Sequence, residues 1–216
     1  MRGVIFGDYH TYEDWKLILN AKNISPPSPK IVKVQVDGRD GDINLSRTLT
    51  GEMKYSNREA SFTFLVTEGS QEEREELINS IVNLLHGNEL KIIEPDDLDH
   101  YLIGEIVVTK TTNDKAYGTI EISADLEPYR YSISEVNRTI TASETKVDVV
   151  LNNTGRKTVT PTLTVDGSIN LEFGSSSASL ETGTYKLSNL NLRSGATVVT
   201  ISGTGFVVFT YREAVI

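Results

Sequence analysis

The chain has no cysteine among its 216 residues. Disulfide-stapled folds, cysteine-ligated zinc, iron-sulfur clusters and thiol catalysis are therefore excluded, because each needs thiol groups. Aromatic residues are also few, at 7%, and Trp15 is the one tryptophan. With 38% apolar and 24% charged residues, the composition is that of a globular protein. Its length suits one large domain or two small ones.

Basic side chains are in the minority, with 21 lysines and arginines against 30 acidic residues and a formal charge of −9. Phosphate binding depends on clustered Lys and Arg, so this balance argues against nucleic acid as the main partner and against anionic membrane surfaces. Long apolar runs are missing too. The segment 103–108 is strand-sized, whereas a membrane span needs roughly 20 residues. We expect neither direct nucleic-acid recognition nor a membrane partner.

The N-terminal segment lacks the apolar region of a secretion signal. Acidic and polar groups arrive early, in Phe6-Gly7-Asp8-Tyr9-His10. We therefore expect the protein to be made and kept in a cytoplasm, or to be assembled there.

A change in composition near residue 131 divides the chain. Residues 1–131 hold 23 acidic and 14 basic side chains, whereas residues 132–216 hold 7 of each. Small polar residues and glycine (Ser, Thr, Asn and Gly) fill 38 of the 85 positions in the second part. We predict two domains with these boundaries, 1–131 and 132–216.

The first part predicts an α+β domain with one main helix on an antiparallel sheet. Ser70 and Glu73 have the spacing of a capping box, so the helix is expected over 71–86, and Gly87 is suited to end it. Its apolar face comprises Leu77, Ile78, Ile81, Val82, Leu84 and Leu85. Strands are expected at 31–36, 60–66, 90–93, 101–109 and 117–124, with a hairpin turn at 113–115.

A proline-rich segment precedes these strands. Pro26, Pro27 and Pro29 remove amide donors and favour extended backbone, which predicts a polar arm or linker near 25–29.

The second part predicts an antiparallel β-sandwich without helices, so that the whole chain is mainly β. Short alternating apolar runs are bounded by turn residues. The runs are 147–149, 163–165, 171–173, 199–201 and 206–211. Turns are expected at 152–155, Asp166-Gly167, Gly174, Thr182-Gly183, Ser194-Gly195 and Gly203-Thr204-Gly205.

Clusters that could carry metal or catalytic chemistry all have a simpler interpretation. The segment from Glu94 to His100 gathers four carboxylates and an imidazole, but Pro and Asp also build solvated hairpin turns, which is the preferred interpretation. The segment from Asp37 to Asp42 lacks the residue order of an EF-hand and is interpreted as a tight loop. No Gly-x-Ser-x-Gly motif occurs. A hydrolase with paired carboxylates stays a distant alternative, and we expect no enzyme, metal site or cofactor.

Several short segments occur in an order that resembles a known family. They are Phe6-Gly7 with Tyr9-His10-Thr11, 37–45, 55–62, His86-Gly87, 96–104, Leu126-Glu127-Pro128-Tyr129, 152–155, 160–163 and 190–195. Together they span essentially the whole chain. The order is similar to that of the distal tail (Dit-like) proteins of long-tailed phages that infect Gram-positive bacteria.

The resemblance implies an N-terminal ring-forming domain and a C-terminal galectin-like β-sandwich. It further implies a homo-hexameric ring that joins the tail-tube protein to tail-tip or baseplate proteins, in a virion tail assembled in the host cytoplasm. Candidates for interface or loop-organising roles are Arg39, Asp40, Gly41, Arg58, Pro128 and Tyr129. The equal alternative is that Arg58 pairs with an acid while Pro128 and Tyr129 close the domain.

The alternative function is a carbohydrate-binding β-sandwich that recognises the host cell wall. The second part has no long insertion for a carbohydrate-binding module, and its larger aromatic residues are mostly candidate core residues, so the adaptor ranks first. These residues are Phe173, Tyr185, Phe206, Phe209 and Tyr211. The acidic first part suits a tube whose negative lumen repels DNA.

Overall fold

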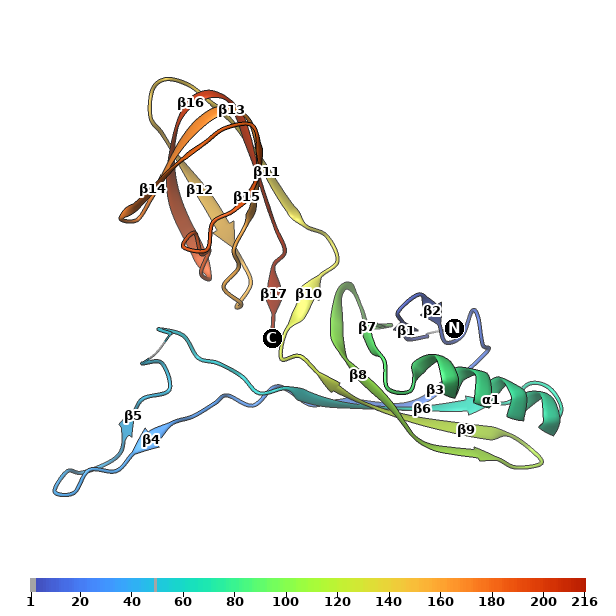
Figure 1. Cartoon of the computed structure of the whole chain (residues 1–216). Coiled ribbons are helices and arrows are strands. Elements are labelled where there is room, and N and C mark those ends of the chain that lie inside the picture. The colour runs from blue at the N-terminus through green and yellow to red at the C-terminus, as the bar shows by residue number, and fades with distance from the viewer. Residues whose placement is uncertain (1–2, 49) are drawn as a thin grey trace. The chain divides into compact units, whose positions relative to one another are not determined.

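The computed structural model describes residues 3–48 and 50–216. The chain forms two compact units, Met1–Arg130 with Ile216 and Tyr131–Val215. Both are built from antiparallel strands, and the described part of the chain contains one helix (Figure 1). That helix is too short and too polar to cross a membrane. The prediction of a mainly β protein is confirmed.

The first unit is built on a sheet with the strand order β2-β1-β7-β8-β9-β6-β3, in which all neighbours are antiparallel. The strands at 60–66, 90–93, 101–109 and 117–124 are confirmed, although their ends differ from the predicted ones. The bounds are β1 (Ile5–Phe6), β2 (Tyr9–His10), β3 (Ile18–Ile24), β6 (Arg58–Val66), β7 (Glu89–Glu94), β8 (Asp97–Asn113) and β9 (Gly118–Leu126).

Strand β6 shows how this sheet buries one face. Ala60, Phe62, Phe64 and Val66 are buried at every second position, as the alternation predicted. Phe6 of β1 meets Phe62 and Phe64 edge-on, with ring centroids 5.5 and 6.2 Å apart. Edge-to-face contacts of this kind add to the free energy gained from burial of the rings. The residues between them are left on the outer face of the sheet.

Helix α1 (Gln71–Leu85) begins with the predicted capping box. Ser70 Oγ accepts a hydrogen bond from the Glu73 amide at 3.2 Å, and Glu73 Oε2 accepts one from the Ser70 amide at 2.7 Å. The bond from the Ser70 amide, together with the Ser70 hydroxyl, holds the pKa of the Glu73 carboxyl below its usual value. Ile78, Ile81 and Leu85 are buried as expected, whereas Leu84 is exposed because it lies at the margin of the apolar stripe.

Arg74 is buried in the same helix, which the apolar pattern did not predict. Its guanidinium donates to the Gly69 carbonyl at 2.7 Å and to the Asp114 carbonyl at 2.7 Å. Its Nε donates to Asn113 Oδ1 at 3.2 Å. Arg74 thus ties the start of α1 to the hairpin turn between β8 and β9, which was predicted at 113–115.

The segment between β3 and β6 begins with the proline-rich residues and forms an arm. Its two short strands, β4 (Lys33–Val34) and β5 (Ile43–Asn44), make a separate two-stranded sheet that extends away from the main sheet (Figure 1). The strand expected at 31–36 is thus shorter than predicted. Pro29 forms a single bridge with Tyr55 across the base of the arm.

The second unit contains one antiparallel sheet of six strands that surrounds its own apolar core. The order is β11-β16-β13-β14, with β12 also paired to β16 and β15 to β13. Short strands β10 and β17 pair where the chain enters and leaves the unit. The bounds are β10 (Arg130–Ser132), β11 (Val136–Ala142), β12 (Val147–Asn153), β13 (Thr162–Phe173), β14 (Ser176–Leu180), β15 (Gly183–Lys186), β16 (Gly195–Tyr211) and β17 (Ala214–Val215).

Two predicted turns in this unit are wrong. Asp166-Gly167 lies inside β13, and Gly203-Thr204-Gly205 lies inside β16. Their glycines have positive φ angles between 102° and 127°, where a strand interior is normally extended. A Cβ on Gly205 would lie 1.9 Å from the Asp166 carbonyl oxygen. Glycine is needed here because β13 and β16 curve as a pair and their backbones approach too closely for a Cβ atom. The chain does not reverse direction at these positions.

The substitution Gly205→Ala is expected to lower the free energy of unfolding of the second unit by about 2 kcal/mol or more, because its Cβ overlaps backbone and φ is positive. Chemical denaturation followed by circular dichroism measures this. Gly174→Asn is the matched control, since Gly174 has φ 56° with no atom within 4 Å of the place a Cβ would take, and Asn tolerates that conformation. Equal losses in both variants would contradict the steric explanation.

Candidate assembly surfaces

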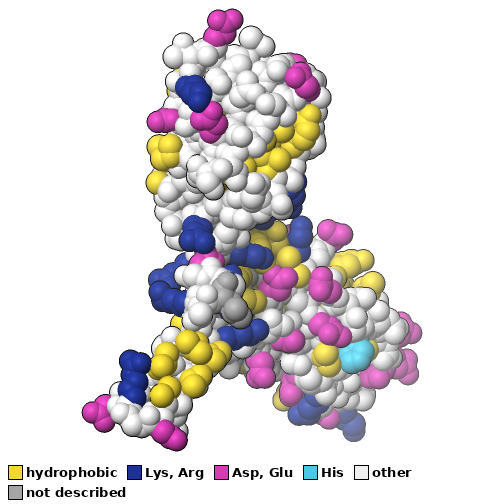
Figure 2. All heavy atoms as spheres, turned by 60° about the vertical axis from the view of Figure 1, so that its left-hand side comes forward, with side chains coloured by type: hydrophobic (Ala, Val, Ile, Leu, Met, Phe, Trp, Pro, Cys, Tyr) yellow, Lys and Arg dark blue, Asp and Glu magenta, His cyan; other side chains and the backbone are white. Residues whose placement is uncertain are grey.

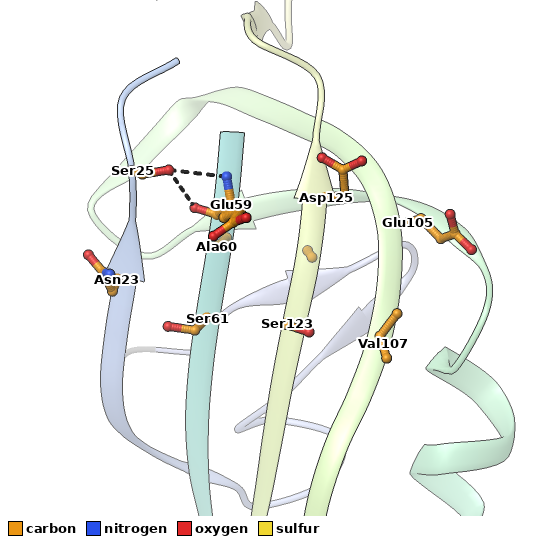
Figure 3. A pocket seen from close by; sticks show the side chains of 10 residues that line it. Asn23, Ser25, Glu59, Ala60, Ser61, Glu105, Val107, Ser123 and Asp125 are labelled. Atoms are coloured by element: carbon orange, nitrogen blue, oxygen red, sulfur yellow. Dashed lines mark hydrogen bonds between the residues drawn. The ribbon is translucent and has the colours of Figure 1, made fainter. Parts of the chain in front are cut away.

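The outer face of the first unit's sheet is acidic. A shallow hollow lies across four strands, lined mainly by residues that alternate with the buried ones, and none of the described lining residues is basic (Figure 3). Three of them, Glu59, Glu105 and Asp125, are carboxylates. The others are Asn23, Ser25, Ala60, Ser61, Val107, Ser123 and Ala124. This surface repels anions and favours cations.

Strand β3 ends this sheet. In the described part of the chain it pairs with β6 along one side and with no strand along the other. Lys22, on β3, reaches the turn between β7 and β8 through its side chain. An unpaired strand edge is a surface on which another strand can add.

The acidic segment from Glu94 to His100 forms the predicted hairpin turn, at Pro95-Asp96 between β7 and β8. The buried Glu94 carboxylate lies 2.6 Å from Lys22 Nζ and 3.4 Å from Arg130 Nη2. Burial lowers the pKa of Lys22, but its bonds to Glu94 and Asp96 outweigh this and the pKa is raised. Within the described residues, no three His, Cys, Asp or Glu side chains are placed to hold a metal ion.

The same network includes His100 and Asp97. Asp97 carboxylate oxygens lie 2.8 Å from His100 Nδ1 and 3.5 Å from Arg130 Nη1. Sequence reasoning missed Lys22 and Arg130, because they lie 72 and 36 positions away from Glu94 in the chain and only folding brings them together.

Arg58, Pro128 and Tyr129 lie together at the base of the arm. Arg58 is buried, and its Nη2 donates a hydrogen bond to the Pro128 carbonyl in place of the acid considered as its partner. Burial lowers the pKa of Arg58, and the nearby Arg130 adds to that effect. Tyr129 packs edge-on against Tyr55 at 6.2 Å. The interface or loop-organising roles of Arg58, Pro128 and Tyr129 stay predictions.

Arg39, Asp40 and Gly41 lie in the exposed loop at the tip of the arm, with positive φ at Gly38 and Gly41. The segment from Asp37 to Asp42 is therefore the tight loop that was expected. Beyond the proline-rich residues 25–29, several large apolar side chains are exposed along the arm (Figure 2). The alternation of Val32, Val34 and Val36 is the sequence signal that could have shown this.

Aromatic side chains in the second unit are mostly in its core. Phe173, Phe209 and Tyr211 are buried, and Phe206 is exposed. Trp15 is buried in the first unit, where it stacks on Tyr9 at 5.2 Å. The described part of the second unit therefore offers one exposed large aromatic ring for stacking on a sugar.

The sequence matches no known family model and no curated protein. Solved structures are similar in fold. The crystal structure of the SPP1 Dit protein (gp 19.1), described as a paradigm of the hub adsorption apparatus in phages that infect Gram-positive bacteria, superposes with a TM-score of 0.72 and 16% identity. The match covers 98% of this chain and 99% of that chain. This chain has the Dit fold.

A second similar structure is the phage P2 baseplate in its activated conformation with Ca. It matches with a TM-score of 0.48 and 9% identity, over 98% of this chain and 97% of that chain. The fold assignment therefore rests on SPP1 Dit.

Replacing Glu94 by Gln is expected to lower the free energy of unfolding of the first unit by about 2 to 3 kcal/mol, because Lys22 and Arg130 lose their buried counter-charge. Urea denaturation followed by Trp15 fluorescence measures it. Glu121→Gln is the control, because Glu121 forms an exposed ion pair with Lys110 at 3.1 Å and should change stability by less than about 0.5 kcal/mol. Similar effects in the two variants would show that the Glu94 network contributes little.

Proposed function

We propose that this protein is a structural ring subunit at the distal end of a phage or prophage tail, where it joins the tail tube to the baseplate or tail tip. The Dit fold, matched over 98% of this chain and 99% of SPP1 Dit, is the observation that carries this proposal. The protein acts in the virion, after assembly in the host cytoplasm, and has no enzymatic role.

The surfaces of the first unit suit such a subunit. Its sheet has an unpaired edge at β3 and an acidic outer face, and its arm extends away from the sheet. Contacts between different surfaces of identical copies form rings when the rotation closes. We propose a homo-hexamer, with the first unit forming the ring and the second a galectin-like domain.

In the proposed ring, the acidic outer face lines the central opening. Carboxylates of Glu59, Glu105 and Asp125 on the wall of the ring opening would repel DNA phosphates and limit adhesion during passage.

Light scattering and negative-stain imaging of the purified chain, alone and with tail-tube protein, test the assembly. We expect closed rings of six copies that bind the end of the tube. A chain that stays monomeric with tube protein present, and binds cell-wall polysaccharide instead, would support the carbohydrate-binding alternative.

A three-dimensional reconstruction of the same rings tests the position of the acidic face. We expect Glu59, Glu105 and Asp125 to line the opening. If they map to the outside of the ring, the proposed role in DNA passage is wrong, whereas the adaptor role still stands.

A further inference from the structure

Two edge strands of the second unit border one groove. Strands β11 and β12 each pair with β16 along one side, and with no strand along the other in the described part of the chain. A groove of about 420 Å³ lies between them, and its lining includes Val136 and Arg138 of β11 and Val150 and Asn152 of β12. The unpaired N–H and C=O groups of an edge strand can bind an added strand. The groove therefore combines a main-chain binding surface with side chains of two strands.

Arg138 breaks the apolar pattern of β11. The other residues on its side of the strand, Val136, Ile140 and Ala142, pack against the core of the second unit. Across the ladder, Arg138 lies opposite the buried Phe209. Its own side chain is exposed and forms no ion pair or hydrogen bond with the residues that the structure describes. A charge at such a position protects an edge strand from unselective pairing and selects a partner of opposite charge.

Hydrogen bonds hold one end of the groove in place. The Glu213 carboxylate accepts from the Thr154 amide and from the Thr154 hydroxyl, both at 2.6 Å. The Tyr211 hydroxyl donates to the Asn152 carbonyl. Burial raises the pKa of Tyr211, and the Glu213 charge adds to this whereas Arg138 opposes it. The acid that lines the groove is thus bound by Thr154, while Arg138 is left for a ligand, and a preformed site of this kind binds at a lower entropic cost.

Exposed valines lie at the groove. Val150 is 52% exposed, and Val198, its direct partner on β16, is 53% exposed. Residues directly opposed across a ladder share a face, so the pair forms an apolar patch on the outer side of the sheet. Among the described residues that line the groove there is no Trp or Phe, and Tyr211 is 5% exposed. The groove therefore offers apolar and cationic contacts, but no open aromatic ring on which a sugar could stack.

We infer that this groove binds an extended peptide segment of a partner protein, which adds to β12 as a further strand. An apolar side chain of the peptide contacts Val150, and an acidic side chain pairs with Arg138. Asp148, near the start of β12, disfavours a second acid opposite it. Strand addition gains affinity from main-chain hydrogen bonds and specificity from alternate side chains. The inference goes beyond the proposed ring and does not depend on it, because every residue involved belongs to the second unit.

Selection from an mRNA-displayed library of random short peptides tests the chemistry of the ligand. The bait is the full chain, and fluorescence anisotropy measures the affinity of the selected peptides. We expect peptides with alternating apolar residues and an acid, which bind the Arg138→Glu variant roughly tenfold more weakly than the wild type. Lys186→Glu is the matched control, because Lys186 is exposed on β15, which pairs with β13 on the side away from β16. This variant should bind the peptides as the wild type does.

A second pair of variants tests the apolar contact. Val150→Lys should also weaken binding of the selected peptides by roughly tenfold, because it removes the apolar side chain at the centre of β12. Phe206→Lys is its control, since Phe206 is 38% exposed on β16 but does not line the groove. Circular dichroism checks that each variant is folded. Equal affinities for Val150→Lys and Phe206→Lys would contradict the proposed contact.

Amide hydrogen exchange tests the strand addition itself. With a selected peptide bound, every second amide of β12, those that point away from β16, should exchange more slowly. Unchanged exchange in β12, peptides that bind Arg138→Glu as tightly as the wild type, or a library that yields no binder each overturn the inference. Cell-wall polysaccharide that binds the wild type but not Arg138→Glu, where no peptide does, would assign the groove to a sugar instead. Ring formation by Arg138→Glu should match the wild type, so these failures leave the ring adaptor standing.

Discussion

The first unit depends on one physical constraint, which is that its sheet buries a single face. Phe62 and Phe64 alternate along β6 and meet Phe6 in the core, so the residues between them must face outward. The acidic outer face is a direct consequence of this alternation. Among the described residues that line the hollow on this face, three are carboxylates and none is basic, so the hollow carries negative charge.

Charged groups that resemble catalytic or metal-binding clusters in the sequence serve the fold instead. Glu94 is held between Lys22 and Arg130, and Asp97 lies between Arg130 and His100. The buried Glu94 carboxylate and the partly exposed Asp97 carboxylate, each paired with a cation, hold the β7–β8 turn. Arg58 and Arg74 act in the same way, because both donate to backbone carbonyls at places where loops leave the sheet. These charged groups therefore stabilise turns and loop junctions of the first unit.

In the arm and in the curved strands of the second unit, the path of the backbone decides which side chains reach a core. The arm holds several apolar side chains away from the core of its own unit. In the second unit, glycines at the close approach of the paired strands β13 and β16 let both strands supply residues to the core on either side of the curve. Val165 and Ile169 are buried on either side of Gly167.

Local signals in the sequence determined much of this protein. The capping box at Ser70 and Glu73 predicted the helix, and the alternation along β6 predicted which residues are buried, because both depend on neighbours within a few positions. Glycine was ambiguous, since Gly174 marks a turn while Gly167 and Gly205 lie inside strands, and a positive φ is compatible with either. Only the tertiary structure decided that Lys22 and Arg130 bind Glu94, that Arg74 is buried, and that the apolar side chains of the arm are exposed. Those features depend on segments far apart in the chain, whose approach is set by strand order and not by local preference.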